Sequence, residues 1–152
     1  MENLKLAETD TYLLEVNSPL SLVYLILKKH ISNEELRQTI LLAVEAAKEY
    51  HLKNIMINSQ RLDYVEMSDQ HWLATEFTQQ IAALPDSEMV PERKVIGILP
   101  EEATRLLVGY TIVEKSEKFQ KEKQKVKIEI FTSLNAALLS LEPAENEKSL
   151  RR

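Results

Sequence analysis

The stretch NIMINSQRLDYVEMSDQHWLATEF, residues 54–77, joins a predicted strand to a predicted helix. Its first residues are a short apolar run, which predicts a buried strand, and a polar link follows. Ser68 precedes the helical pattern, so we expect its side chain to cap the first helical turn. The apolar stripe of this helix comprises Leu73, Phe77, Ile81 and Leu84.

Trp72 is the single tryptophan of the chain. It is adjacent to Leu73, so on an ideal helix it lies about 100° away from the apolar stripe. We therefore expect its side chain to be partly exposed. A partly exposed tryptophan is a candidate contact for a partner protein, and packing at the edge of the core is the alternative.

The sequence before this stretch predicts an antiparallel meander and then a helix. Three short segments separated by turn residues predict the strands: Asn3–Glu8, Tyr12–Asn17 and Ser21–Lys28. Ser32 and Glu35 follow with the spacing of a capping box, in which the two side chains satisfy backbone N–H groups at a helix start. Apolar residues at helical spacing continue to Tyr50 and predict a first amphipathic helix.

The sequence after this stretch predicts two further strands and two further helices. The strands are RKVIGIL, residues 93–99, and VKIEIF, residues 126–131. Pro100, followed by two glutamates, suits the first turn of a third helix, and SLNAALLSL, residues 133–141, predicts a short closing helix.

Strands that alternate with helices predict an α/β fold with right-handed crossovers. We expect one mixed sheet with parallel central strands and about four helices. A chain of 152 residues is long enough to bury one core, so residues 1–142 are predicted to form a single domain. Residues 143–152 are polar and predict a frayed, disordered tail.

Composition excludes several classes of protein. There is no cysteine, which rules out disulfides and thiolate chemistry, and no apolar run approaches the length of a membrane span. The net charge of -5 gives no general attraction to nucleic acid or to anionic lipid. The basic run KSEKFQKEKQKVK contains interleaved glutamates and suits the solvated end of a helix. We expect a cytoplasmic protein that binds neither nucleic acid nor membranes.

Catalytic and cofactor motifs are weak. Gly97 and Gly109 stand alone, so no glycine-rich loop for a nucleotide is present, and we expect no cofactor. The three histidines lack the spacing of a metal site. Ser59 and Ser68 have no histidine or nucleophile-elbow pattern beside them. We expect no catalytic residue and no metal.

One local cluster could carry chemistry. It consists of Asp63, Glu66, Asp69 and His71, which could bind a hard cation or act as acid and base. The alternative is structural, because Asp69 suits the dipole of a helix start and Asp63 suits a turn.

The order of elements and the stretch IMINSQRLDYVEMSDQHWL resemble the anti-sigma-factor-antagonist-like fold, called STAS or SpoIIAA-like. The sequence looks closest to a divergent branch of small bacterial STAS-like proteins, in which two patterns recur. The pattern D-x-x-W-L is matched by Asp69, Trp72 and Leu73, and the pattern I-x-x-F-x-x-x-x-x-A-L-x-x-L by Ile128, Phe131, Ala137, Leu138 and Leu141. The resemblance covers most of residues 3–141 and implies a STAS-like domain.

The resemblance also implies a candidate switch. In phospho-regulated antagonists the strand ends in aspartate, and a serine of an Asp-Ser-Ser-Gly pattern is phosphorylated by a partner kinase. A placement without gaps puts Asn58 at the strand end and residues 66–69 over that pattern, with Ser68 and Asp69 at its last two positions. A phosphate on Ser68 would favour the helix N-terminus but would lie between two acidic residues. Ser68 is therefore either a regulatory site or a helix cap.

Three functions follow, in decreasing order of support. The first is a non-enzymatic regulatory or protein-interaction module of STAS type, which requires a protein partner. The second is a binder of a small apolar ligand or lipid, in a pocket like those of related lipid-carrier folds of the CRAL-TRIO kind. The aliphatic segments SLVYLILKKHI and EEATRLLVGYTIV suggest it, and ordinary core packing is the alternative. The third is an enzyme that uses the acidic cluster.

The third predicted helix suggests a homodimer. One apolar stripe, ending at Val113, would bind the helix to the sheet. Val108, Ile112 and Phe119 lie close to the opposite side, where a surface helix is usually polar. A second copy of the chain could cover this second stripe, because two-fold homodimers are the commonest soluble assembly. The alternative is a few scattered exposed hydrophobic residues.

Overall fold

The computed structural model describes residues 3–86, 88–100, 103–120 and 126–141, and for residues 103–110 it describes the backbone alone. This described part is an α/β domain with one six-stranded sheet and four helices, as predicted. The strands are β1 (Leu4–Glu8), β2 (Tyr12–Asn17), β3 (Leu22–Leu27), β4 (Asn54–Asn58), β5 (Arg93–Ile98) and β6 (Val126–Phe131).

The helices are α1 (Asn33–Tyr50), α4 (Ala103–Gln120), α5 (Leu134–Leu139), and one continuous segment built from α2 (Met67–Trp72), the π-helical turn η1 (Leu73–Phe77) and α3 (Thr78–Ala82). The predicted tail, 143–152, and the two glutamates after Pro100 lie outside the described residues.

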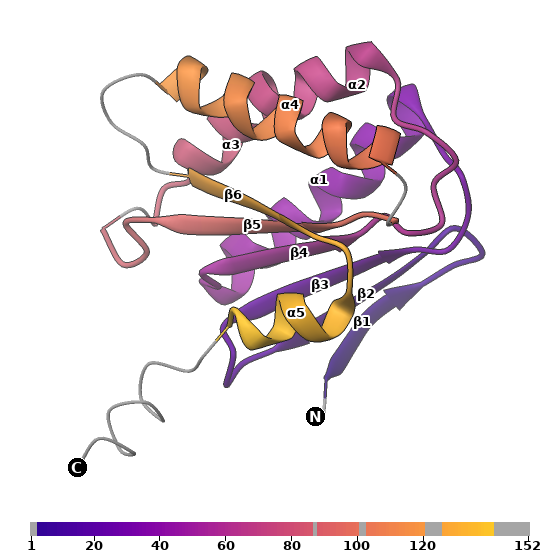
Figure 1. Cartoon of the computed structure of the whole chain (residues 1–152). Coiled ribbons are helices and arrows are strands. Elements are labelled where there is room, and N and C mark those ends of the chain that lie inside the picture. Colours follow the sequence, from indigo (N-terminus) through magenta and orange to yellow (C-terminus); the bar gives the residue numbers. More distant parts are fainter. Residues whose placement is uncertain (1–2, 87, 101–102, 121–125, 142–152) are drawn as a thin grey trace.

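The sheet is mixed, with the strand order β1-β2-β3-β4-β5-β6. The first three strands pair antiparallel, and β3 to β6 pair parallel. Both the predicted N-terminal meander and the predicted parallel centre are therefore confirmed (Figure 1).

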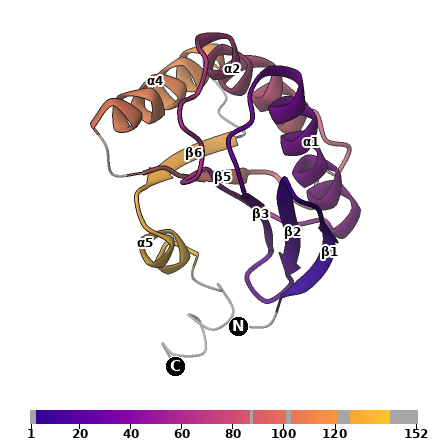
Figure 2. The same ribbon diagram turned by 90° about the vertical axis from the view of Figure 1, so that its right-hand side faces the viewer.

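The two faces of the sheet are covered unequally. Helices α1 to α4 lie over one face, and α5 alone packs on the other, against β5 and β6 (Figures 1 and 2). The domain has two hydrophobic cores, one on each face of the sheet, and successive side chains of β3 point into them alternately. Val23 and Leu25 belong to the larger core, whereas Leu22 and Tyr24 belong to the smaller core under α5. All four are buried, so β3 reads as a continuous apolar run.

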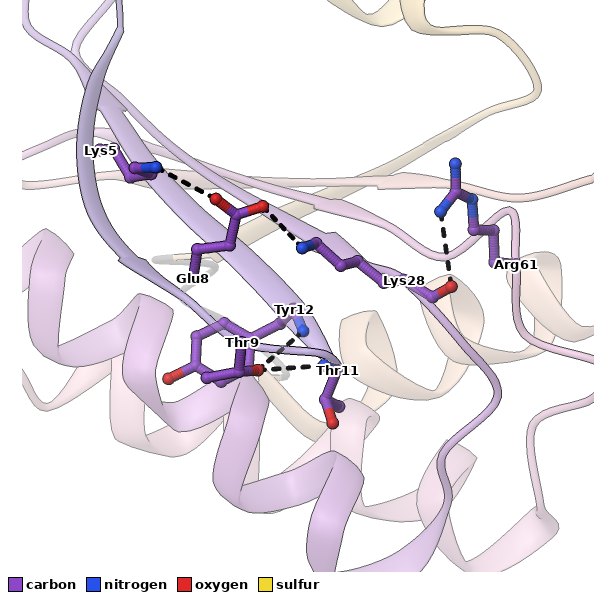
Figure 3. Close-up of polar contacts among 7 residues, drawn as sticks. All are labelled: Lys5, Glu8, Thr9, Thr11, Tyr12, Lys28 and Arg61. Atoms are coloured by element: carbon purple, nitrogen blue, oxygen red, sulfur yellow. Dashed lines mark hydrogen bonds and ion pairs between the residues drawn. The ribbon is translucent and has the colours of Figure 1, made fainter.

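Polar contacts stabilise the end of the meander where β1 turns into β2 (Figure 3). The Glu8 carboxylate accepts hydrogen bonds from Lys28 Nζ at 2.6 Å and from Lys5 Nζ at 3.1 Å. The bond from Lys28 is the main reason that the pKa of Glu8 lies below its ordinary value, and Lys5 lowers it further. Thr9 Oγ1 accepts from the N–H groups of Thr11 and Tyr12 and so closes the turn between β1 and β2. These contacts tie the edge strand β1 to the end of β3 across β2.

Candidate functional site

At the start of the link between β4 and α2, hydrogen bonds hold the end of β4 in place. Asn58 Nδ2 donates to the Tyr24 hydroxyl at 3.1 Å, and Asn58 Oδ1 accepts from the Gln60 N–H at 3.1 Å. The Ser59 N–H donates to the Ile98 carbonyl at 2.9 Å. Burial raises the pKa of the Tyr24 hydroxyl, so this group stays protonated near neutral pH. Asn58 therefore connects the end of β4 to the neighbouring strand and to the start of the link.

Ser68 does not cap α2, and this prediction was wrong. The N-cap residue is Glu66, whose backbone is extended, and no side chain caps the helix there. Because helical backbone already begins at Met67, Ser68 is the second residue of the helix. Its side chain is exposed, and its hydroxyl lies 3.4 Å from Asn33 Oδ1.

Ser68→Ala is accordingly expected to change the free energy of unfolding by less than about 0.5 kcal/mol, as for an ordinary surface position. Ser133→Ala is the matched control, since Ser133 Oγ accepts from the Ala136 N–H at 3.1 Å and caps α5. The control should lose about 1 kcal/mol. Urea unfolding of both variants measures the difference, and equal losses would contradict this assignment of the caps.

Asp69 is a buried anchor. Its carboxylate, 0% exposed, accepts from the Asn33 N–H at 2.8 Å and from Arg37 Nε at 2.9 Å. Ser32 occupies the N-cap position of α1 but makes no side-chain capping bond, so the predicted capping box with Glu35 is not formed. Asp69 caps α1 from a different helix instead, and this contact fixes the start of α2 against the start of α1.

Trp72 is buried, at 6% exposure, so the predicted partial exposure was wrong. The π-helical turn that follows it adds one residue to the turn, and residues five apart then share a side of the helix. Trp72 and Phe77 are five apart, and their ring centroids lie 5.6 Å from each other. The Arg37 guanidinium lies over the indole at 5.8 Å. Trp72 therefore packs against α1 and the core, and its predicted contact with a partner loses the exposure on which it rested.

The acidic cluster is not assembled into one site. Asp69 is engaged with α1, as described, whereas the Asp63 N–H donates to His30 Nδ1 at 3.0 Å. The side chains of Asp63 and His71 are exposed. Within the part of the chain that the structure describes, no three histidine or acidic side chains are placed to hold a metal ion. His30 stacks on Tyr64, with ring centroids 4.4 Å apart.

The second stripe predicted for α4 does not face outward. Ile112 is buried at 7% exposure and belongs to the main core, so its assignment to an outer surface was wrong. Val113, from the opposite stripe, also packs against that core. Phe119 is exposed at 42%, and the side chain of Val108 lies outside the described residues. Self-association through this helix stays a prediction, but Ile112 cannot take part in it.

An apolar cavity of about 60 Å³ lies between the sheet and the helices. Strands β4, β5 and β6 form its floor, and α1, the π-helical turn, α4 and the link after β4 form its walls. Among the described residues, Ser59 carries its only side-chain polar group. The sequence suggested a pocket for an apolar ligand as an alternative, from the segments SLVYLILKKHI and EEATRLLVGYTIV. Among the described residues of those segments, Ile112 alone lines this cavity. The available clue was Gly97, a glycine inside a predicted strand.

A buried ion pair at the amino-terminal end of β5 was also missed. Arg93, at the start of β5, donates from both terminal nitrogens to Asp86, at 2.9 and 2.6 Å, and from Nε to the Leu52 carbonyl at 3.0 Å. His51 Nδ1 lies 3.0 Å from Asp86 Oδ2. His51 ends α1 in the left-handed region, with φ of 53°. Asp86 and Arg93 are seven residues apart with a loop between them, and His51 is 35 residues before Asp86, so no regular spacing marks the cluster.

The Arg93 guanidinium is the main reason that the pKa of Asp86 falls from 3.8 to about 2, and burial opposes this shift. Because the folded-state pKa is the lower one, the unfolded chain binds more protons between the two values. The stabilisation by this pair is therefore complete above about pH 4 and is lost as the pH falls through about 2. We expect the difference in unfolding free energy between wild type and Asp86→Asn to shrink over this range. A difference that is constant with pH would contradict the pairing.

Comparison of the sequence with known proteins did not assign the chain to a family. No protein-family model matches the chain, and no curated protein matches it. Among the described helices, none is both long enough and apolar enough to cross a membrane.

Proposed function

We propose that this chain is a non-enzymatic regulatory or protein-interaction module of STAS type, whose partner binds at the start of α2. The observation that carries the proposal is the contrast between neighbouring residues there. Met67 is 79% exposed and Ser68 is exposed, whereas Asp69 is fully buried and fixed to α1. A helix start that is held in place and presents exposed apolar and hydroxyl-bearing side chains is suited to recognition by another protein.

Tyr64 extends the candidate surface into the link before α2. Its side chain is 53% exposed, although one face of the ring contacts His30. An aromatic ring held in this way offers a large contact area at low cost in side-chain entropy. The candidate surface is thus defined by Tyr64, Met67 and Ser68.

The surroundings of Ser68 are compatible with phosphorylation. The negative charge of Asp69 is already matched by Arg37 and by the N–H of Asn33. A phosphate on Ser68 would therefore meet less repulsion than the sequence alone implied, and it would lie in the first turn of a helix segment, where negative charge is favoured. Regulation by a partner kinase is part of the proposal.

The test of the surface compares two exposed methionines. Met67→Lys should abolish capture of a partner from an extract of the native host, whereas Met89→Lys should leave capture unchanged. Met89 is 69% exposed but lies in the loop before β5, so it controls for a general effect of replacing methionine with lysine. Capture of the same protein by both variants would exclude this surface. A wild-type chain that captures no protein more strongly than Met67→Lys would do the same.

The test of regulation uses phosphopeptide mass spectrometry after incubation with ATP and host extract. We expect phosphate on Ser68 in the wild type and no phosphate on the corresponding peptide of Ser68→Ala. Phosphate on other serines alone, with Ser68 unmodified, would contradict the regulatory part of the proposal and would leave the interaction surface to its own test.

A further inference from the structure

Two irregular features of the fold, distant in the sequence, border the same apolar cavity. One is Gly97, in the middle of the parallel strand β5, and the other is the π-helical turn Leu73–Phe77. Leu73 and Phe77 line the cavity on the side of the helices, and Gly97 lines it on the side of the sheet. Each feature alone has a local cost, because glycine weakens a strand and a π-helical turn interrupts regular helical bonding.

Backbone conformation does not require glycine at position 97. Gly97 does not have a positive φ, so a residue with a side chain could adopt the same backbone conformation. A Cβ atom at this position would lie 3.0 Å from Ile130 Cδ1, the end of a flexible side chain that also lines the cavity. The Ile130 side chain therefore packs against the bare backbone of Gly97, and a residue with a Cβ atom there would displace Ile130 at the cavity wall. A glycine in a strand often marks a place where another molecule approaches closely.

The π-helical turn shapes the other side. It places Phe77 on the same side as Trp72, with the ring centroids 5.6 Å apart, and Leu73 is only partly buried at the cavity wall. Such turns occur often at functional sites, where a wider helical turn redirects side chains. Leu73, Val65 and Ile130 are each partly exposed, so the lining reaches the protein surface.

The chemistry of the lining defines the class of ligand. The walls carry leucine, isoleucine, valine and phenylalanine side chains, and no charged side chain lines the cavity among the described residues. An apolar cavity of about 150 Å³ stays dry and binds benzene or xenon. The cavity here, at about 60 Å³, holds a smaller group. The Ser59 hydroxyl can donate to or accept from one polar group of a ligand.

We propose that this cavity is a binding site for a small uncharged apolar group, such as an alkyl chain of a few carbons that carries at most one hydroxyl. This site is independent of the protein-interaction surface at the start of α2, which lies on exposed side chains. Failure of one proposal therefore leaves the other to its own experiment.

The experiment is a titration of the full chain with short n-alkyl alcohols, ethanol to hexanol, and with xenon, followed by NMR of the methyl groups. Saturable shifts are expected at Ile57, Ile128 and Ile130, which line the cavity. Methyl groups of Ile96 and Ile98, in the core under α5, are the internal control and should not shift. Affinity should rise with chain length until the cavity is full and then stop rising.

Two variants that reduce the cavity test its location. Gly97→Ala and Leu73→Phe each add atoms at its wall and should weaken alcohol binding about tenfold, the factor that corresponds to about 1.4 kcal/mol. Glu76→Ala is the matched control, because Glu76 is an exposed residue of the same π-helical turn that does not line the cavity. If one filling variant does not fold, the other still gives the result.

Three outcomes would overturn the proposal. The first is binding of xenon without binding of any alcohol, which would indicate a sealed packing defect. The second is a shift of equal size at the control methyl groups of Ile96 and Ile98. The third is that Gly97→Ala and Leu73→Phe bind alcohols as tightly as wild type.

Discussion

Arg93→Met is expected to lower the free energy of unfolding by about 3–5 kcal/mol, the range for removing one partner of a buried ion pair. Arg93 is 3% exposed, and its three hydrogen bonds reach Asp86 and the Leu52 carbonyl. Without the guanidinium, the Asp86 carboxylate stays buried and loses its strongest partner, and the contact with His51 remains. Chemical denaturation at pH 7 measures the loss.

The double variant Arg93→Met/Asp86→Leu shows how much of the lost stability comes from the unpaired Asp86 carboxylate and how much from lost packing. Replacing both members of a buried pair by apolar residues is often nearly neutral, so the double variant should recover most of the stability lost by Arg93→Met. A double variant as unstable as the single one would show that the loss comes from packing and from the Leu52 carbonyl. The pair would then contribute little through its charges.

Asp69→Ala is expected to cost about 2–4 kcal/mol, because one substitution removes two charge-assisted hydrogen bonds, one of which caps α1. The Asn33 N–H loses its acceptor, and Arg37 loses the carboxylate that places its guanidinium over Trp72. The side chain of Arg37 is 27% exposed, so water replaces part of this contact. Thermal and urea unfolding measure the change.

Asp69→Asn and Arg37→Gln are the matched variants. Asparagine keeps an oxygen that can accept from the Asn33 N–H, so Asp69→Asn should cost less than Asp69→Ala. Arg37→Gln removes only the partly exposed partner and should cost the least. If Arg37→Gln is as damaging as Asp69→Ala, the ion pair and not the helix cap accounts for the stability.

The strands and long helices could be predicted because their causes are local. VYLIL is a continuous apolar run, which is typical of a strand buried on both faces, whereas the apolar residues of α1 recur at the spacing of a helix with one buried face. Parallel pairing followed from the alternation of strands with helices. The number of helices and the mixed sheet were therefore predicted correctly.

The candidate site was predicted less well because its contacts come from distant parts of the chain. Ser68 has the chemistry of a cap, but the acceptor that satisfies a helix start is Asp69, which acts on α1 and not on its own helix. Trp72 and Ile112 were misplaced because ideal helical spacing was assumed. The π-helical turn after Trp72 places this residue on the same side of the helix as Phe77. The orientation of α4 over η1 and β6 places Ile112 in the core.

The sheet also has a consequence for how the chain folds. Its strands lie side by side in the order in which they occur in the sequence, so no strand must be inserted between two strands that are already paired. Each pairing closes only the loop that contains the intervening helix or turn, which limits the loop-closure entropy that folding must overcome. During synthesis, the hairpins of β1, β2 and β3 can form before α1 has left the ribosome. Every later strand then extends an existing edge, and a chain that stops early leaves one open edge and not a gap inside the sheet.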